Sequence, residues 1–230
     1  MPQTIAKLAA GLTATLALVS CASVSVEDGT TGEVQQMPEI IYVAGFDPTP
    51  AEFKFDRSGT ELAEFKQNLQ LMLKTGIAAD LTDKLVPAAA VGKGKQSGLS
   101  NAWLVRGQFT DVEQGSRALR SVFGFSAGET KLETKVEVYD LLHGDGTPFL
   151  TFSTTGGSGA EPGALAGGIT TDPLQLAIGG VSGAAHGLSE DTARTAREIT
   201  AEFSDYMYHR GWITEDQWIK PKHERATDTW

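Results

Sequence analysis

The feature that most constrains this fold is a strict alternation of side chains in the middle of the chain. The inward set is Leu132, Thr134, Val136 and Val138, and the outward set is Lys131, Glu133, Lys135 and Glu137. Side chains of a β-strand point alternately to the two faces of a sheet, so residues 131–141 are predicted to form a strand with one buried face. A glycine-containing turn at 143–146 and a β-rich run at 148–154 follow, and together they predict an antiparallel hairpin.

Two further strands are expected upstream of this hairpin. Residues 39–46 form a short apolar run, and residues 102–112 place Trp103, Val105 and Phe109 on one face. Both runs are rich in β-branched and aromatic residues, which favour strands. The three large side chains of the second run are therefore expected in the core of the sheet.

Two helices are expected to accompany the strands. Ser58 and Glu61 fit a capping box, and apolar side chains follow at helical spacing up to Pro87. This stretch is predicted to be either one bent helix or two consecutive helices. The last helix is expected to begin at Ser189 and to end at Gly211.

These elements predict an α+β fold, with a small, mainly antiparallel sheet of about four strands and its helices packed on one face. Residues 39–213 are expected to form a single domain, which includes a glycine-rich insert at 153–187. Residues 214–230 are expected to be a C-terminal tail.

The first 20 residues have the composition of a targeting signal. Lys7 precedes a twelve-residue run, 8–19, that is apolar apart from one glycine and two threonines. A helix that spans a bilayer needs roughly 20 apolar residues, so this run suits the core of a signal peptide better. Residues 1–20 are therefore predicted to be a signal peptide.

The apolar run ends in the sequence LVSC, whose cysteine is Cys21, and this resembles the lipobox of bacterial lipoproteins. The resemblance implies that a diacylglycerol is attached to Cys21 and that cleavage makes Cys21 the first residue. The alternatives are a plain secretory signal with an incidental cysteine, or an uncleaved anchor. Residues 21–38 are expected to be a flexible tether, and Ala22, in place of an aspartate, favours the outer membrane.

Charge and cysteine content narrow the function classes. The chain has 19 Lys and Arg against 29 Asp and Glu, a formal net charge of −10, which becomes −11 when residues 1–20 and their one lysine are removed. So acidic a chain is a poor general binder of nucleic-acid phosphates. The single cysteine excludes an internal disulfide and a cysteine-cluster metal site, and the four histidines do not stand at metal-ligand spacing. We predict no catalytic residue, cofactor or metal, and do not expect an enzyme.

The glycine-rich insert contains two sets of glycines spaced four residues apart. They are Gly159, Gly163 and Gly167, and then Gly179, Gly183 and Gly187. Residues four apart share a helix face, and glycine there lets two helices approach closely. One interpretation is a glycine-zipper hairpin that packs on itself, on the bilayer or on a second copy. The other, which is favoured, is a loop or a local hairpin, because glycine in an exposed helix costs about 1 kcal/mol per residue.

A second candidate is a docking patch of two arginines and two aromatic residues. They are Arg117, Arg120, Phe123 and Phe125. Arginine and aromatic residues are favoured at the centres of protein interfaces. The alternative, which is preferred, is structural: these side chains cover an edge strand or pair with the nearby acids Glu113 and Glu129.

The stretch from Trp103 to Gly159, with the run WLVRGQFTDVEQGSRALRSVFGFSAGETKLETKVEVYDL and then TFSTTGGSG, resembles a bacterial lipoprotein family of unknown function, domain of unknown function 4410. The opening strand IYVAGFD and the later segments DTARTAREI and RGWI are similar to the same family, so the likeness covers about residues 39–213. The resemblance implies a secreted, typically lipid-anchored bacterial protein, and it supplies no catalytic residues.

These observations lead us to expect a lipid-anchored lipoprotein of the cell envelope that faces the periplasm from the outer membrane. Its expected role is non-enzymatic binding or assembly, and its expected partner is an envelope protein or a second copy of the chain. The lipid on Cys21 is expected to hold it at the membrane, and no nucleic acid is expected as a partner. The alternative is a self-assembling secretion or pore-type subunit that uses the glycine-rich segment.

Overall fold

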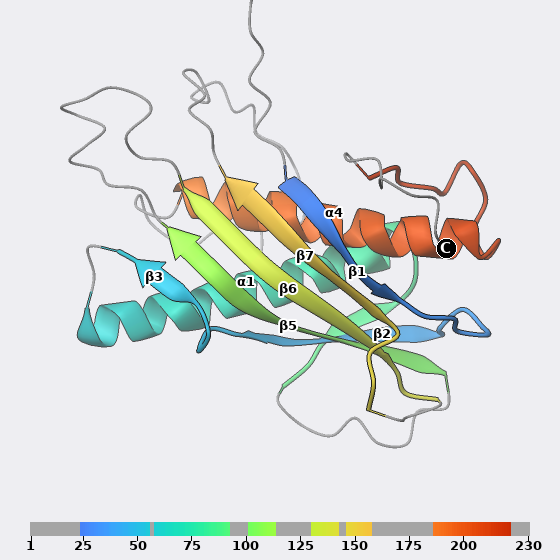
Figure 1. The fold of residues 1–230 in the computed structure, drawn as a ribbon, viewed down its shortest axis with the longest axis horizontal. Helices are drawn as coiled ribbons and strands as arrows, with labels where there is room; N and C mark the ends of the chain where they lie inside the picture. Colours follow the sequence, from blue (N-terminus) through green and yellow to red (C-terminus); the bar gives the residue numbers. More distant parts are fainter. Residues whose placement is uncertain are drawn as a thin grey trace, which may run out of the picture.

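The computed structural model describes residues 24–55, 58–92, 101–113, 130–142, 146–157 and 186–221. The elements of these ranges are β1 (Val24–Thr31), β2 (Ile40–Asp47), β3 (Glu52–Lys54), α1 (Gly59–Lys84), β4 (Ala88–Ala90), β5 (Ala102–Glu113), β6 (Lys131–Asp140), β7 (Leu150–Gly157) and α4 (His186–His209). The two helices lie side by side against one face of a twisted sheet (Figure 1).

The described strands form one seven-stranded mixed sheet in the order β1-β7-β6-β5-β2-β4, and β3 pairs with β5 beyond the end of β2. The pairs β1–β7, β7–β6 and β6–β5 are antiparallel. Strand β2 is parallel to both β4 and β5, and β3 is parallel to β5. The prediction of a small, mainly antiparallel sheet of about four strands is therefore wrong, although the fold is α+β. The parallel half arises because α1 carries the chain back across the sheet between β2 and β4.

Helix α1 is a single helix of 26 residues, which decides between the two sequence interpretations. Its buried side chains Phe65, Leu69, Leu73, Ile77 and Leu81 recur every fourth residue, so one stripe faces the sheet along the whole helix. The predicted capping box is wrong. The N-cap residue has an extended backbone, but its side chain makes no capping hydrogen bond.

Strand β6 alternates as the sequence predicts, with its inward side chains buried. Strand β5 alternates only in part: residues 102–105 are all buried, and the β5–β6 register shifts between Phe109 and Asp111. Thr110 is the extra residue of this β-bulge. Before the bulge the odd-numbered Phe109 points into the core, and after it the even-numbered Val112 does. Both side chains are fully buried.

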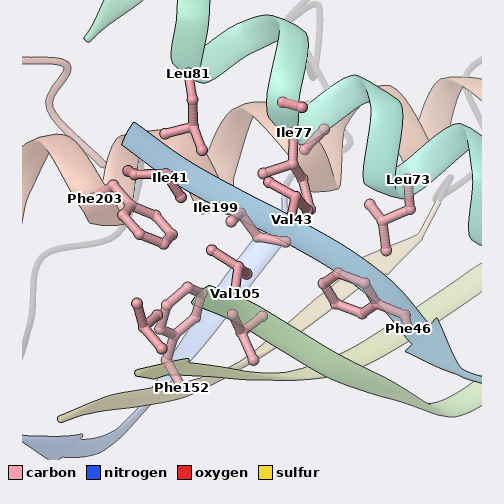
Figure 2. Close-up of a cluster of buried hydrophobic side chains, with 14 of the residues drawn as sticks. Ile41, Val43, Phe46, Leu73, Ile77, Leu81, Val105, Phe152, Ile199 and Phe203 are labelled. Atoms are coloured by element: carbon pink, nitrogen blue, oxygen red, sulfur yellow. The ribbon is translucent and has the colours of Figure 1, made fainter. Parts of the chain in front are cut away.

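The core lies between the sheet and the two helices (Figure 2). The side chains that fill it include Ile41, Val43 and Phe46 from β2, Leu73, Ile77 and Leu81 from α1, Val105 from β5, Phe152 from β7, and Ile199 and Phe203 from α4. The expected core residues of β5 belong to the same cluster. Burying one such side chain stabilises the fold by about 1.5–3 kcal/mol, so this layer is the main source of stability.

The segment expected to be a tether, residues 21–38, contains a strand instead. Strand β1 pairs with β7, with Val24 opposite Gly156 and Asp28 opposite Phe152. The side chain of Val24 is buried. Strand β7 would otherwise be an open edge, and its unpaired backbone groups explain why a polar, glycine-containing segment adopts a strand here. The folded domain therefore includes the chain from Val24 onward.

The chain after α4 also differs from the expected tail. Gly211 follows the helix with φ 69°, so the predicted helix end is confirmed. Residues up to 221 then pack back on α4: the indole N–H of Trp218 donates to Asp205 Oδ1 at 3.0 Å, and the backbone N–H of Ile219 donates to Ser204 Oγ at 2.8 Å. Residues 222–230 of the expected tail lie outside the described residues.

Candidate functional site

Four strands begin or end along one row of the sheet, from which three segments of the chain leave (Figure 1). Val24 lies opposite Gly156, and Lys131 lies opposite both Glu113 and Gly157. Strands β1 and β6 therefore begin, and β5 and β7 end, on this side. We call this row the loop edge and define it by Val24, Glu113, Lys131 and Gly157.

The residues that the sequence singles out belong, with one exception, to the segments that leave at the loop edge, and they lie outside the described residues. Cys21 precedes Val24 by three residues. The segment 114–129 contains Arg117, Arg120, Phe123 and Phe125. The segment 158–185 contains Gly159, Gly163, Gly167, Gly179 and Gly183. The exception is Gly187, which lies in the first turn of α4. The fold thus brings the ends of these segments to one edge.

Paired charges cover the part of the loop edge where β3, β5 and β6 meet. The ammonium of Lys131 lies 3.1 Å from Asp111 Oδ2 and 2.7 Å from Glu133 Oε1. Hydrogen bonds to these two carboxylates raise the pKa of Lys131 above its usual range. Lys54 of β3 pairs with Glu113. Exposed pairs of this kind are screened by solvent and contribute little to stability, so their main effect is to neutralise the charges of this surface.

Two partly exposed aromatic rings, on either side of Lys54 in the sequence, pack toward α1. The ring centroids of Phe53 and Phe55 are 5.7 Å apart, and Phe55 lies 4.8 Å from the buried Phe65 of α1. The ammonium of Lys66 lies 4.0 Å from the centroid of the Phe53 ring. This corner of the loop edge therefore presents two aromatic rings and the ammonium of Lys66.

A buried carboxylate joins α4 to the start of β6. The side chain of Asp191 is fully buried, and it accepts hydrogen bonds from the Thr130 hydroxyl and, at 3.1 Å, from Arg194 Nη1. Burial raises the pKa of Asp191, and the hydrogen bond from Thr130 and the charge of Arg194 oppose that rise. Glu190 binds the same guanidinium at 3.2 Å. These contacts fix the first turns of α4 against the sheet.

Threonine hydroxyls continue this polar layer between the sheet and α4. The hydroxyls of Thr134 and Thr154, which face each other across β6 and β7, are 2.7 Å apart. A Cβ atom placed on Gly156 would lie 3.2 Å from Thr195 Oγ1, so the helix approaches β7 closely there. In the described ranges Thr134 and Thr154 bond to each other, Thr195 Oγ1 is buried without a hydrogen-bond partner, and no three histidine, cysteine or acidic side chains gather as metal ligands. The contacts of Asp191 with Thr130 and Arg194 position the helix against the sheet.

The sequence predicts that Asp191 lies in the first turn of the last helix, where the helix dipole favours an acid. Helix α4 instead begins at His186, three residues before its predicted start, so Asp191 lies beyond the first turn. Sequence reasoning missed the burial of Asp191 and the Phe53–Phe55 corner. Strand β3 has only three residues, which is too short for an alternating pattern to be recognised. The buried Thr134 was predicted from alternation and is confirmed.

The comparison with known families agrees with the resemblance drawn from the motifs. Residues 41–172 match the family described as Domain of unknown function (DUF4410). The chain belongs to this family, whose fold is here a mixed seven-stranded sheet backed by two helices in the described residues. No curated protein matches the sequence significantly. Within the described ranges, neither helix is long and apolar enough to cross a membrane.

Two solved structures are similar in outline. The PelC dodecamer from Paraburkholderia phytofirmans is 10% identical over 74% of this chain and 93% of that chain, with a TM-score of 0.40. A Helicobacter pylori protein described as a homolog of a neuraminyllactose-binding hemagglutinin is 11% identical over 77% of this chain and 91% of that chain, with a TM-score of 0.37. Neither similarity bears on the function of this chain.

Proposed function

We propose that this protein is a lipoprotein of the bacterial cell envelope, anchored through Cys21 at the outer membrane and facing the periplasm. Its role is non-enzymatic binding or assembly. The observation that carries the proposal is the position of Val24: the first described strand starts three residues after the lipobox cysteine, close to where a mature lipoprotein would begin. The twelve-residue apolar run before Cys21 is removed with the signal peptide.

The lipid accounts for membrane attachment on its own. Each buried CH₂ contributes about 0.8 kcal/mol, so two or three acyl chains hold a protein almost irreversibly. The buried Asp191 is bonded to Thr130 and fixes α4 on the sheet, and the buried Thr134 and Thr154 bond to each other between β6 and β7; this structural use of the buried polar groups favours a binding or assembly role over catalysis.

The test is the intact mass of protein extracted from membranes. Wild type is expected to begin at Cys21 and to carry the mass of the acyl chains, and Cys21→Ser is expected to lack that mass. Ser20→Ala is the matched control, because it keeps a small residue before the cysteine and should be processed normally. A mature chain that begins elsewhere, or an unmodified Cys21, would refute the proposal.

The assembly role is tested by crosslinking in intact cells and by the mass of the particle in mild detergent. An envelope protein crosslinked to the chain supports the proposal. A ring-sized homo-oligomer would instead favour the alternative of a self-assembling secretion or pore-type subunit that uses the glycine-rich segment.

A further inference from the structure

We propose that the loop edge faces and touches the membrane, with the strands standing away from the bilayer and the opposite end of the sheet pointing into the aqueous space. This inference rests on the proposed lipid at Cys21 and adds the orientation of the domain and the kind of lipid surface it meets.

The first step is the length of chain between the lipid and the fold. Three residues from Cys21 to Val24 span at most about 11 Å when fully extended. Val24 is held in place, because its side chain is buried and β1 is paired with β7 from Val24 to Asp28. The lipid attachment point and the loop edge therefore stay within about 11 Å of each other.

The second step is the distance to the opposite end. Strand β6 runs from the loop edge to Asp140 and has 10 residues, so the far end of the sheet lies roughly 33 Å away at 3.3 Å per residue. Leu142, at that end, is 39% exposed. A tether of three residues cannot carry the far end to the bilayer unless the domain lies flat.

The third step is the chemistry of the surface. Phe53 and Phe55 are partly exposed at the loop edge, and the ammonium of Lys66 lies 4.0 Å from the centroid of the Phe53 ring. Aromatic rings and long lysine side chains suit the interface between lipid headgroups and acyl chains, where the ring is half-buried and the ammonium reaches water.

The ion pairs at this edge indicate which headgroup it meets. Carboxylates of Asp111, Glu113 and Glu133 lie against the ammonium groups of Lys54 and Lys131. The described loop edge is therefore charge-paired and is not a basic patch that would attract anionic lipid. A zwitterionic surface, such as phosphatidylethanolamine, fits this arrangement.

The experiment uses the acylated full-length protein in vesicles of phosphatidylethanolamine and phosphatidylcholine. Because Cys21 is the only cysteine and is blocked by the lipid, an engineered cysteine gives a single labelling site. Three exposed positions sample the height of the domain: Lys54→Cys at the loop edge, Leu71→Cys on the outer side of α1, and Leu142→Cys at the far end. A fluorophore at each position is quenched by lipids that carry a nitroxide on the headgroup.

Most of the fluorescence is expected to be lost at position 54, part of it at position 71, and none at position 142. Equal quenching at positions 54 and 142, or stronger quenching at position 142, would overturn the orientation. The zwitterionic assignment would be overturned if the label at position 54 were not quenched in these vesicles, which lack anionic lipid, but were quenched in vesicles that contain it.

A linker variant is the matched control. A Gly/Ser insert of about 20 residues after Ala22 has an r.m.s. length of about 25 Å and should abolish the difference between the labels. A difference that persists would mean that the tether does not set the orientation. The acyl mass at Cys21 is measured on the same samples: an acylated protein with the wrong quenching pattern refutes the orientation alone, and a chain without acyl mass refutes the proposed function as well.

Discussion

Replacement of Gly107 by alanine is expected to destabilise the domain through one contact. Gly107 of β5 lies opposite Phe46 of β2. A Cβ atom placed on Gly107 would lie 2.3 Å from Phe46 Cε1 and 2.7 Å from the backbone oxygen of Lys135. Both distances are shorter than any real Cβ contact, and Phe46 is fully buried, so neither the ring nor the β6 backbone has free space to move into.

The expected magnitude follows from two opposing effects. Overpacking a core typically costs about 1–3 kcal/mol. Removing a glycine from a strand offsets about 0.5–1 kcal/mol, because the unfolded chain loses freedom. The net loss for Gly107→Ala is therefore about 1–2 kcal/mol, and the melting temperature should fall by roughly 2–8 °C for a domain of this size.

Gly45→Ala is the matched control on the neighbouring strand. A Cβ atom there would meet only Gln70 Oε1, at 3.6 Å, which is an ordinary contact. Thermal and urea unfolding of the chain without residues 1–21 compare the two variants with wild type. Gly45→Ala should be neutral or slightly stabilising.

A double-mutant cycle tests the mechanism. Phe46→Leu removes the ring that the added methyl group would strike, so Gly107→Ala should cost less in that background than in wild type. A coupling of about 0.5 kcal/mol or more is expected for residues in direct contact. Strictly additive effects, or a Gly107→Ala variant as stable as Gly45→Ala, would refute the close approach of Phe46 to β5.

Three further predictions concern the core and the polar layer. Val136→Ala should cost about 2 kcal/mol and lower the melting temperature by roughly 4–8 °C, because Val136 is fully buried; an unchanged melt would mean the β6 register is wrong. Tyr206→Phe should cost about 1–3 kcal/mol in urea unfolding, because its hydroxyl donates to Gly32 O at 2.9 Å and accepts from the buried Val34 N–H at 3.2 Å; equal stability would contradict this contact. Asp191→Asn should change the pH dependence of stability. Because burial raises the folded pKa of Asp191 above the ordinary 3.8, the folded state holds the proton more tightly, and wild type should lose stability relative to the variant as pH rises from about 4 through the raised pKa. Parallel stability curves for the two proteins would exclude a raised pKa.

The central strands and both helices could be predicted from the sequence because each carries its own periodic signal. Residues 131–138 alternate without interruption, and β6 occupies them. The predicted strands at 39–46 and 102–112 correspond to β2 and β5 within one residue at each end. The hairpin partner predicted at 148–154 is β7, which extends to Gly157.

The outer strands could not be predicted, because they form through contacts distant in sequence. Strand β4 consists of three alanines, which are poor strand formers, and it pairs with β2 only because α1 returns the chain to that position. Strand β1 contains Asp28 and Gly29, both unfavourable in strands, and it is held by the open edge of β7. The loop edge includes the start of β1, so the short spacing between Cys21 and the first strand could not be predicted from the sequence either.

Helix α4 illustrates a second limit of periodic patterns. Its apolar stripe, which includes Ile199 and Phe203, indicates one buried face, yet Ser204 and Asp205 are buried as well. Helix α1 packs along α4, and the chain after Gly211 returns to it, so α4 is covered on more than the sheet side. Ser204 and Asp205 are tolerated there because Ile219 and Trp218 donate hydrogen bonds to them. A polar residue on a helix therefore indicates a solvent-exposed position only when no other segment of the chain donates or accepts a hydrogen bond at that residue. The spacing of residues along the helix does not show whether such a segment exists.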